Sequence, residues 1–176
     1  MKLMKLTRPM TPMKPMKPRT AATAATVVAL ALAGLAVSAP TAGASGTKLS
    51  QATAAGQFRS AGITWSSSGG CTTRSNSTCT SFEQINSGTV STIITLKQSS
   101  GCAINITGGT EVGHASGTYS HYNGYKVDIS RSSCIDGYIQ NSFTYIGLRG
   151  DGYPQWKAAS GNLYCNEGSH WDILVY

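Results

Sequence analysis

The sequence predicts an α+β domain, in which one helix packs on a small antiparallel sheet stapled by disulfide bonds. Apolar residues recur near helical spacing between Ser81 and Leu96, which predicts an amphipathic helix. Two shorter segments, residues 102–107 and 125–129, alternate apolar and polar residues as strands do. Loops rich in glycine and serine separate these segments, and strands packed against a helix in this way are typical of the α+β class.

The first half of the domain is expected to contain most of the helical residues. The segment LSQATAAGQF has modest helical character, and residues 63–65 are expected to form a short strand. Thr80 or Ser81 is the expected cap of the main helix, and Ser99-Ser100-Gly101 is expected to end it. Residues 102–107 then form a strand, and a glycine-rich loop follows, GGTEVGHASGTYSHYNG.

The second half is expected to supply the remaining strands. After the strand at residues 125–129, Ile135, Ile139 and Phe143 recur every four residues, which predicts a short helix. The segment TYIGL is expected to be extended, and RGDGYP has the composition of a turn. WDILVY closes the chain as the last strand.

The first 44 residues are expected to be an export signal. Six basic residues and no acidic ones precede an uncharged stretch from Ala21 to Ala39, and Ala42-Gly43-Ala44 follows. A basic segment, a short apolar segment and an A-x-A site are typical of a secretory signal peptide. The alternative is an uncleaved membrane anchor, because the uncharged stretch approaches spanning length. Its high alanine and threonine content and the following proline favour cleavage.

Removal of the signal would leave the chain almost neutral. Six of the 14 Lys and Arg residues lie in it, which leaves eight against seven Asp and Glu, a net charge of +1 instead of +7. The basic character therefore gives no support for nucleic-acid or membrane binding. We expect a secreted bacterial protein, extracellular or in the cell wall, that is monomeric and has no nucleic-acid partner and no membrane contact after signal cleavage.

The mature chain is long enough for one core and too short for two domains. We expect residues 45–79, a lead-in and a cysteine-bracketed loop, to form one globular unit with residues 80–176.

Five cysteines are expected to pair mostly with one another in an oxidising compartment. Cys71 and Cys79 bracket a short polar loop, and Cys102 and Cys134 each lie beside a predicted strand. We therefore favour the bonds Cys71–Cys79 and Cys102–Cys134, although other pairings are open. Cys165 would then be a free thiol or a link between two chains. The chain has no C-x-x-C spacing, so a zinc site made only of cysteines is not expected.

All three histidines lie in polar segments beside predicted strands. His114 and His121 fall in the glycine-rich loop, and His170 lies just before the last strand. Since the apolar residues of segment 125–129 face the core, Asp128 faces the other way. If the last strand neighbours this one, His121, Asp128 and His170 can converge.

Two imidazoles and one carboxylate suit Zn²⁺, and they leave a fourth position for water, as in catalytic zinc sites. Glu167, three residues before His170, could then take the proton from the activated water. The alternatives are surface histidines without a shared role, an ordinary Asn123-Gly124 hairpin and a solvated loop glutamate.

The pattern H-x-x-G-x-x-x-D followed by E-x-x-H-W resembles the zinc site of the D-alanyl-D-alanine peptidase family. That family includes D,D-carboxypeptidases, D,D-dipeptidases and L-alanyl-D-glutamate endolysins, and the resemblance covers residues 80–176. In this chain the motif residues are His121, Gly124 and Asp128, followed by Glu167 and His170.

The resemblance implies the Hedgehog/DD-peptidase fold and peptidoglycan stem peptides as substrates. It implies that His121, Asp128 and His170 bind Zn²⁺, and that Glu167 acts as general base and then as acid to the leaving amine. His114 is a candidate loop donor to the substrate, and Asp172 a candidate partner that orients a metal ligand.

The sequence departs from the family at two positions. Thr110 or Glu111 stands where the family carries an arginine that holds the substrate and stabilises the oxyanion, and Lys126 replaces the usual alanine. Arg149 or Arg131 could supply the missing cation from another loop. These departures keep open a non-catalytic cell-wall or peptide-binding module on the same fold, and a disulfide-stapled inhibitor or signalling protein.

Overall fold

The computed structural model describes residues 46–176, and the predicted signal peptide at residues 1–44 lies outside the described residues. Three helices occur in this part of the chain, α1 (Gln51–Ser60), α2 (Ser87–Ser100) and α3 (Ser133–Ser142). The strands are β1 (Lys48–Leu49), β2 (Thr64–Trp65), β3 (Ile85–Asn86), β4 (Asn105–Gly108), β5 (Lys126–Ser130), β6 (Thr144–Leu148), β7 (Pro154–Lys157), β8 (Leu163–Asn166) and β9 (His170–Leu174). Among residues 46–176, none of the helices has the length and apolar character needed to span a membrane.

The main sheet has seven strands in the order β2-β4-β5-β9-β8-β7-β6, and β1 and β3 form a separate two-stranded sheet. All neighbours in the main sheet are antiparallel except β2 and β4, which are parallel. The prediction of a helix packed on an antiparallel sheet is therefore confirmed in outline, but three helices are present instead of one and the β2–β4 pair is parallel. The sheet is larger than predicted, since it also contains β7 and β8. These four-residue strands were not predicted, because their sequences show too little alternation of apolar and polar residues.

The main helix begins later than predicted. The prediction placed its cap at Thr80 or Ser81, but α2 begins at Ser87, and residues 81–86 run through turns and the short strand β3. Long-range contacts explain the difference, because Phe82 packs edge-on against Phe58 and Trp65 at 4.9 and 5.3 Å between ring centroids. The predicted end is confirmed, since α2 stops at Ser100 and the following Gly101 is left-handed with φ 67°.

The remaining elements lie close to their predicted places. The strands predicted at residues 102–107 and 125–129 are β4 and β5, displaced towards the C-terminus, and the last strand begins at His170. The short helix and the extended TYIGL segment are α3 and β6. Both predicted disulfides, Cys71–Cys79 and Cys102–Cys134, are present, and Cys165 is free and buried.

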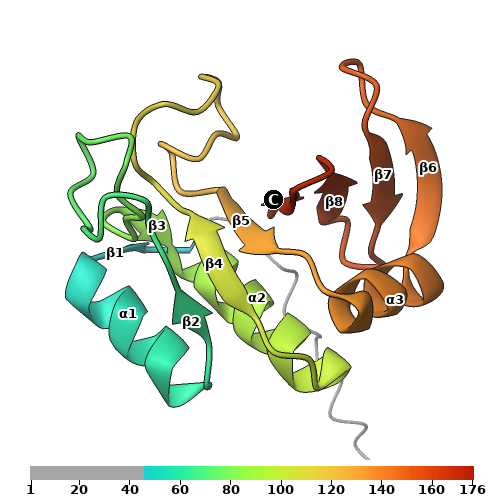
Figure 1. The fold of residues 1–176 in the computed structure, drawn as a ribbon, viewed down its shortest axis with the longest axis horizontal. Helices are drawn as coiled ribbons and strands as arrows, with labels where there is room; N and C mark the ends of the chain where they lie inside the picture. The colour runs from blue at the N-terminus through green and yellow to red at the C-terminus, as the bar shows by residue number, and fades with distance from the viewer. Residues whose placement is uncertain (1–45) are drawn as a thin grey trace, which may run out of the picture. The chain divides into compact units, whose positions relative to one another are not determined.

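The hydrophobic core lies between one face of the sheet and the helices α1 and α2, which lie beside the strands β2, β4 and β5 (Figure 1). The helices contribute Ala54, Ala55, Phe58, Val90, Ile93 and Leu96 to this core, and the strands contribute Ile106, Val127, Ile129, Trp171 and Ile173. Since alternate residues of a strand point to opposite faces, the polar residues of β5 and β9 are directed to the other side of the sheet.

Candidate functional site

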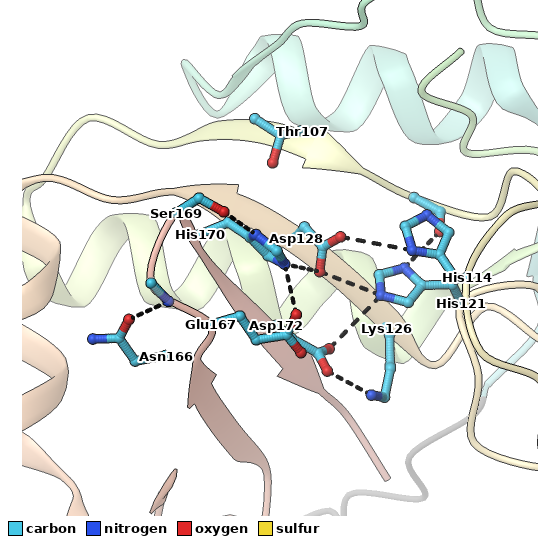
Figure 2. Close-up of polar contacts among 12 residues, drawn as sticks. Thr107, His114, His121, Lys126, Asp128, Asn166, Glu167, Ser169, His170 and Asp172 are labelled. Carbon is cyan, nitrogen blue, oxygen red and sulfur yellow. Dashed lines mark hydrogen bonds and ion pairs between the residues drawn. The ribbon is translucent and has the colours of Figure 1, made fainter. Parts of the chain in front are cut away.

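The two carboxylates at the centre of the site are direct partners in neighbouring strands. β5 and β9 are neighbouring strands, which is the condition under which His121, Asp128 and His170 were expected to converge. Asp128 is in register with Asp172. Further along the same ladder, Ser130 is in register with His170. This register puts His170, Asp128 and Asp172 on the same polar face of the sheet (Figure 2).

His121 is held against this face by the loop that precedes β5. Its Nδ1–H donates to the Gly109 carbonyl at 2.8 Å, so Nε2 is the ring atom directed at the carboxylates. Nε2 lies 3.3 Å from Asp128 Oδ1 and 3.7 Å from Asp172 Oδ1. A backbone carbonyl bonded to one imidazole nitrogen is the usual way to fix the other as a metal ligand.

The turn after His121 requires glycine. Gly124 has φ +77°, and a Cβ atom at this position would lie 2.6 Å from the Gln84 carbonyl oxygen. The Gly124 amide donates to the His121 carbonyl at 2.7 Å, and this bond closes the turn. The predicted Asn123-Gly124 turn therefore exists and carries the histidine into the site.

His170 approaches from the start of β9. Its Nδ1 is hydrogen-bonded to the Ser169 hydroxyl at 2.9 Å, and its Nε2 lies 3.7 Å from Asp128 Oδ1. The same nitrogen is 3.2 Å from Glu167 Oε2. The four residues that the sequence placed together, His121, Asp128, His170 and Glu167, therefore do meet (Figure 2).

His114 also belongs to this cluster. Its ring stacks on the His121 ring with centroids 3.8 Å apart and 15° between the planes. Its Nε2 is bonded to Glu111 Oε1 at 3.1 Å, and its Nδ1 lies 3.9 Å from Asp128 Oδ2. The ligand atoms of His114, His121 and Asp128 all lie within 4.8 Å of one another, so this group could hold a metal ion.

Glu111, one of the two residues that stand in the place of the expected arginine, is held by hydrogen bonds within the protein. Its buried carboxylate accepts hydrogen bonds from the amides of Ser81 at 2.7 Å and Gly109 at 3.0 Å. Burial alone would raise the pKa of Glu111, but the bonds from His114 and these amides hold the pKa below its ordinary value. Glu111 therefore orients His114. The sequence does not predict this role, because Glu111 stands there as an ordinary loop glutamate.

Two buried carboxylate oxygens in the cluster lack a hydrogen-bond partner within residues 46–176. They are Oδ1 of Asp128 and Oδ1 of Asp172. Burial acts to raise the pKa of Asp128, but the close approach of the His121 imidazole and the charges of the neighbouring histidines lower it below its usual range. Both residues are more than nine-tenths buried, so each of these oxygens has lost hydration that a nearby cation could offset.

Space for the Asp128 carboxylate comes from the neighbouring strand β4. Gly108 is the cross-strand partner of Asp128, and a Cβ atom on Gly108 would lie 2.4 Å from Asp128 Oδ2. Any side chain at this position would push the carboxylate out of place.

The cluster opens into a pocket of about 530 Å³. Its lining adds Lys126, Arg149 and Asp151 to the acids and histidines. Arg149 bonds to Asp151 and Glu167 and donates to Asp172 at 2.8 Å. Arg131 does not line the pocket, since it pairs with Asp136 at 2.8 Å. Asp151 was missed because its RGDG context indicates only a turn.

Comparison with family models, with curated proteins and with solved structures finds no match for this chain. The side chains of the pocket therefore provide the basis for a functional proposal.

Proposed function

We propose that the protein is a secreted zinc metallopeptidase that hydrolyses peptide bonds in peptidoglycan stem peptides. The observation that carries this proposal is that His121 Nε2 and His170 Nε2 lie 3.3 and 3.7 Å from the same atom, Asp128 Oδ1. This oxygen is buried and has no hydrogen-bond partner within residues 46–176. Each of these three atoms can offer a lone pair, and a glutamate lies next to them. Two imidazoles, one carboxylate and an open position fit the donor set of catalytic zinc.

The stacking of the rings favours His170 over His114 as the third ligand. An imidazole nitrogen offers its lone pair in the plane of the ring. Since the rings of His114 and His121 are nearly parallel and 3.8 Å apart, an ion close to both cannot lie in both planes. We therefore assign the zinc ligands to His121, Asp128 and His170, and we assign to His114 the role of a donor to the substrate.

A bound zinc ion would polarise the substrate carbonyl and lower the pKa of a water molecule to about 7. Glu167 lies at the entrance of the site with Oε2 3.2 Å from His170 Nε2, where it can take a proton from the attacking water and pass it to the leaving amine. Water adds to the carbonyl carbon as the C–N bond breaks, and both of its protons end on the amine.

The order of elements supports a relation to the Hedgehog/DD-peptidase fold. A helix, a strand, a histidine-bearing loop and a second strand follow one another as α2, β4, residues 109–125 and β5, and the last strand, β9, pairs with β5. The two disulfide bonds suit an oxidising compartment, which supports export from the cell.

The first test is metal content of the purified protein by elemental analysis, with a His121→Ala variant beside it. One zinc per chain, lost in the variant, is expected. A chain that holds no zinc after zinc has been supplied and the excess removed rules out the proposal. Glu167→Ala is then expected to keep the zinc and lose peptide hydrolysis, whereas retained turnover removes Glu167 from the mechanism.

A non-catalytic wall-binding module is the second candidate. The pairing of Glu167 with Arg149 favours it, because Arg149 occupies a carboxylate oxygen of the residue that would have to take the proton from water. Incubation with purified peptidoglycan separates the two. New free amines indicate the enzyme, and retention on the wall without new amines indicates the module.

A further inference from the structure

The carboxylate of Asp128 faces a different loop histidine with each of its two oxygens. His121 Nε2 lies 3.3 Å from Oδ1, whereas His114 Nδ1 lies 3.9 Å from Oδ2. Figure 2 shows the two rings on the same side of the carboxylate, each joined to its own oxygen. The zinc site proposed above uses only Oδ1 of this carboxylate.

Glu111 determines which nitrogen of His114 is directed at Asp128. Its carboxylate is held by the amides of Ser81 and Gly109, and its Oε1 lies 3.1 Å from His114 Nε2. Because an ionised carboxylate only accepts hydrogen bonds, Nε2 carries the hydrogen and Nδ1 of the neutral ring keeps a lone pair. A carboxylate behind a histidine in this way is the usual support of a metal-binding imidazole. The 3.9 Å between Nδ1 and Asp128 Oδ2 is too long for a hydrogen bond, but a zinc ion about 2.0–2.2 Å from each atom fits between them.

We propose that His114 Nδ1 and Asp128 Oδ2 form a second metal site, so that Asp128 bridges two zinc ions. The first ion is the one held by His121, Asp128 Oδ1 and His170, and the inference therefore rests on the proposed function. Water completes the coordination of the second ion, which has two protein ligands.

The stacking of the two rings sets the spacing of the two ions. An imidazole binds an ion in the plane of its ring, and the planes of His114 and His121 are 15° apart with centroids separated by 3.8 Å. One ion cannot lie in both planes, but one ion in each plane gives two ions at about the separation of the rings. Enzymes that use two metal ions hold them about 3.5–4 Å apart, which is the same spacing.

The charge of the cluster also favours more than one ion. The pocket lining contains four carboxylates and two permanent cations, Lys126 and Arg149, and the Glu111 carboxylate behind His114 is a fifth acid. With the histidines neutral, five negative charges less two positive charges leave an excess of three. One divalent ion reduces this excess only to one, so the loaded first site still attracts a cation. The four carboxylates of the lining belong to Asp128, Asp151, Glu167 and Asp172.

The second site is expected to be the weaker one and to regulate hydrolysis. It has two protein ligands where the first has three, and its ion is repelled by the first, so we expect it to bind zinc at least about tenfold more weakly. An ion at Nδ1 takes from His114 the atom that would donate to the substrate. Zinc at concentrations that fill the second site is therefore expected to inhibit hydrolysis.

The test measures the number of zinc ions per chain at increasing free zinc, by equilibrium dialysis and elemental analysis. Wild type is compared with His114→Phe, which keeps a ring stacked on His121 but removes the nitrogen ligand. The control is Asp151→Asn, which removes an exposed acid of the same pocket. X-ray absorption at the zinc edge then measures the zinc–zinc distance in fully loaded wild type, and this measurement does not depend on how a variant folds.

We expect two zinc ions per chain in wild type and in Asp151→Asn, one in His114→Phe, and a zinc–zinc distance of about 3.5–4 Å in wild type. A single ion in wild type, a second ion that His114→Phe keeps, or two ions without this short distance overturns the second site and leaves the first intact. Loss of both ions in His114→Phe places His114 in the first site and overturns the two-ion arrangement. A chain that binds no zinc overturns this inference and the proposed function together.

Discussion

Asp128 and Asp172 face each other across the β5–β9 ladder, and the Oδ1 atoms of both are buried without a hydrogen-bond partner among the described residues. Like charges directly opposite in a sheet are destabilising. Asp172 is offset by Lys126 and Arg149 through Oδ2. Among the described residues, Asp128 is paired with histidines alone, so its charge is the one that a metal ion would balance.

Zinc is therefore expected to stabilise the fold. A ligand that binds only the folded state at 100 times its dissociation constant adds about 2.7 kcal/mol to the free energy of unfolding. Thermal unfolding of wild type should shift upward with zinc and downward with a chelator. Asp128→Asn should abolish the shift, and a variant that keeps the full shift would contradict the assignment of Asp128 as a ligand.

Gly108→Ala is expected to weaken zinc binding by about 10–100-fold, because the new methyl group would lie 2.4 Å from Asp128 Oδ2 and displace the ligand carboxylate. The matched control is Gly137→Ala, since a Cβ atom at this position in α3 has open space around it. The control should keep wild-type affinity and gain about 0.5–1 kcal/mol in stability. Metal titration followed by competition with a chelator measures the affinities, urea unfolding measures the stability, and equal affinities in the two variants would refute the close contact.

Asp136 is expected to contribute to stability at neutral pH and to lose that contribution in acid. Burial opposes the charged form, but hydrogen bonds from Arg131 and from Trp171 Nε1 at 2.7 Å hold the pKa of Asp136 below its usual value. A lowered folded-state pKa stabilises the fold above the unfolded pKa of about 3.9, and the effect disappears as the pH falls through the folded value.

Urea unfolding of wild type and Asp136→Asn between pH 7 and pH 3 measures this dependence. The difference in unfolding free energy should be largest at pH 7 and shrink below about pH 4. A difference that stays constant with pH would show that Asp136 acts through shape alone.

Cys165 is expected to be unreactive in the folded protein. Its side chain is buried, and burial raises the pKa of the thiol to about 11. Because the thiolate is the reactive form, a thiol reagent at pH 8 should label Cys165 only after unfolding. Rapid labelling of one thiol in the native state would contradict its burial. The same burial argues against the alternative in which Cys165 links two chains.

The sequence alone determined which residues can meet at the site. Alternation along β5 directs Asp128 away from the core, and the same rule directs His170 and Asp172 to one face of β9. The Asn123-Gly124 turn and the helix end at Gly101 follow from local backbone preferences. These features are local, so a single sequence expresses them.

Only the tertiary structure decided the partners and the register. The pairing of Asp128 with Asp172, the stacking of His114 on His121 and the arrival of Arg149 from beyond β6 depend on how separate segments of the chain pack together. The later start of α2 has the same origin, since burial of Phe82 outweighs the helical pattern around it. Alternation fixes the face on which a side chain lies, but packing of the whole core selects the strand beside it.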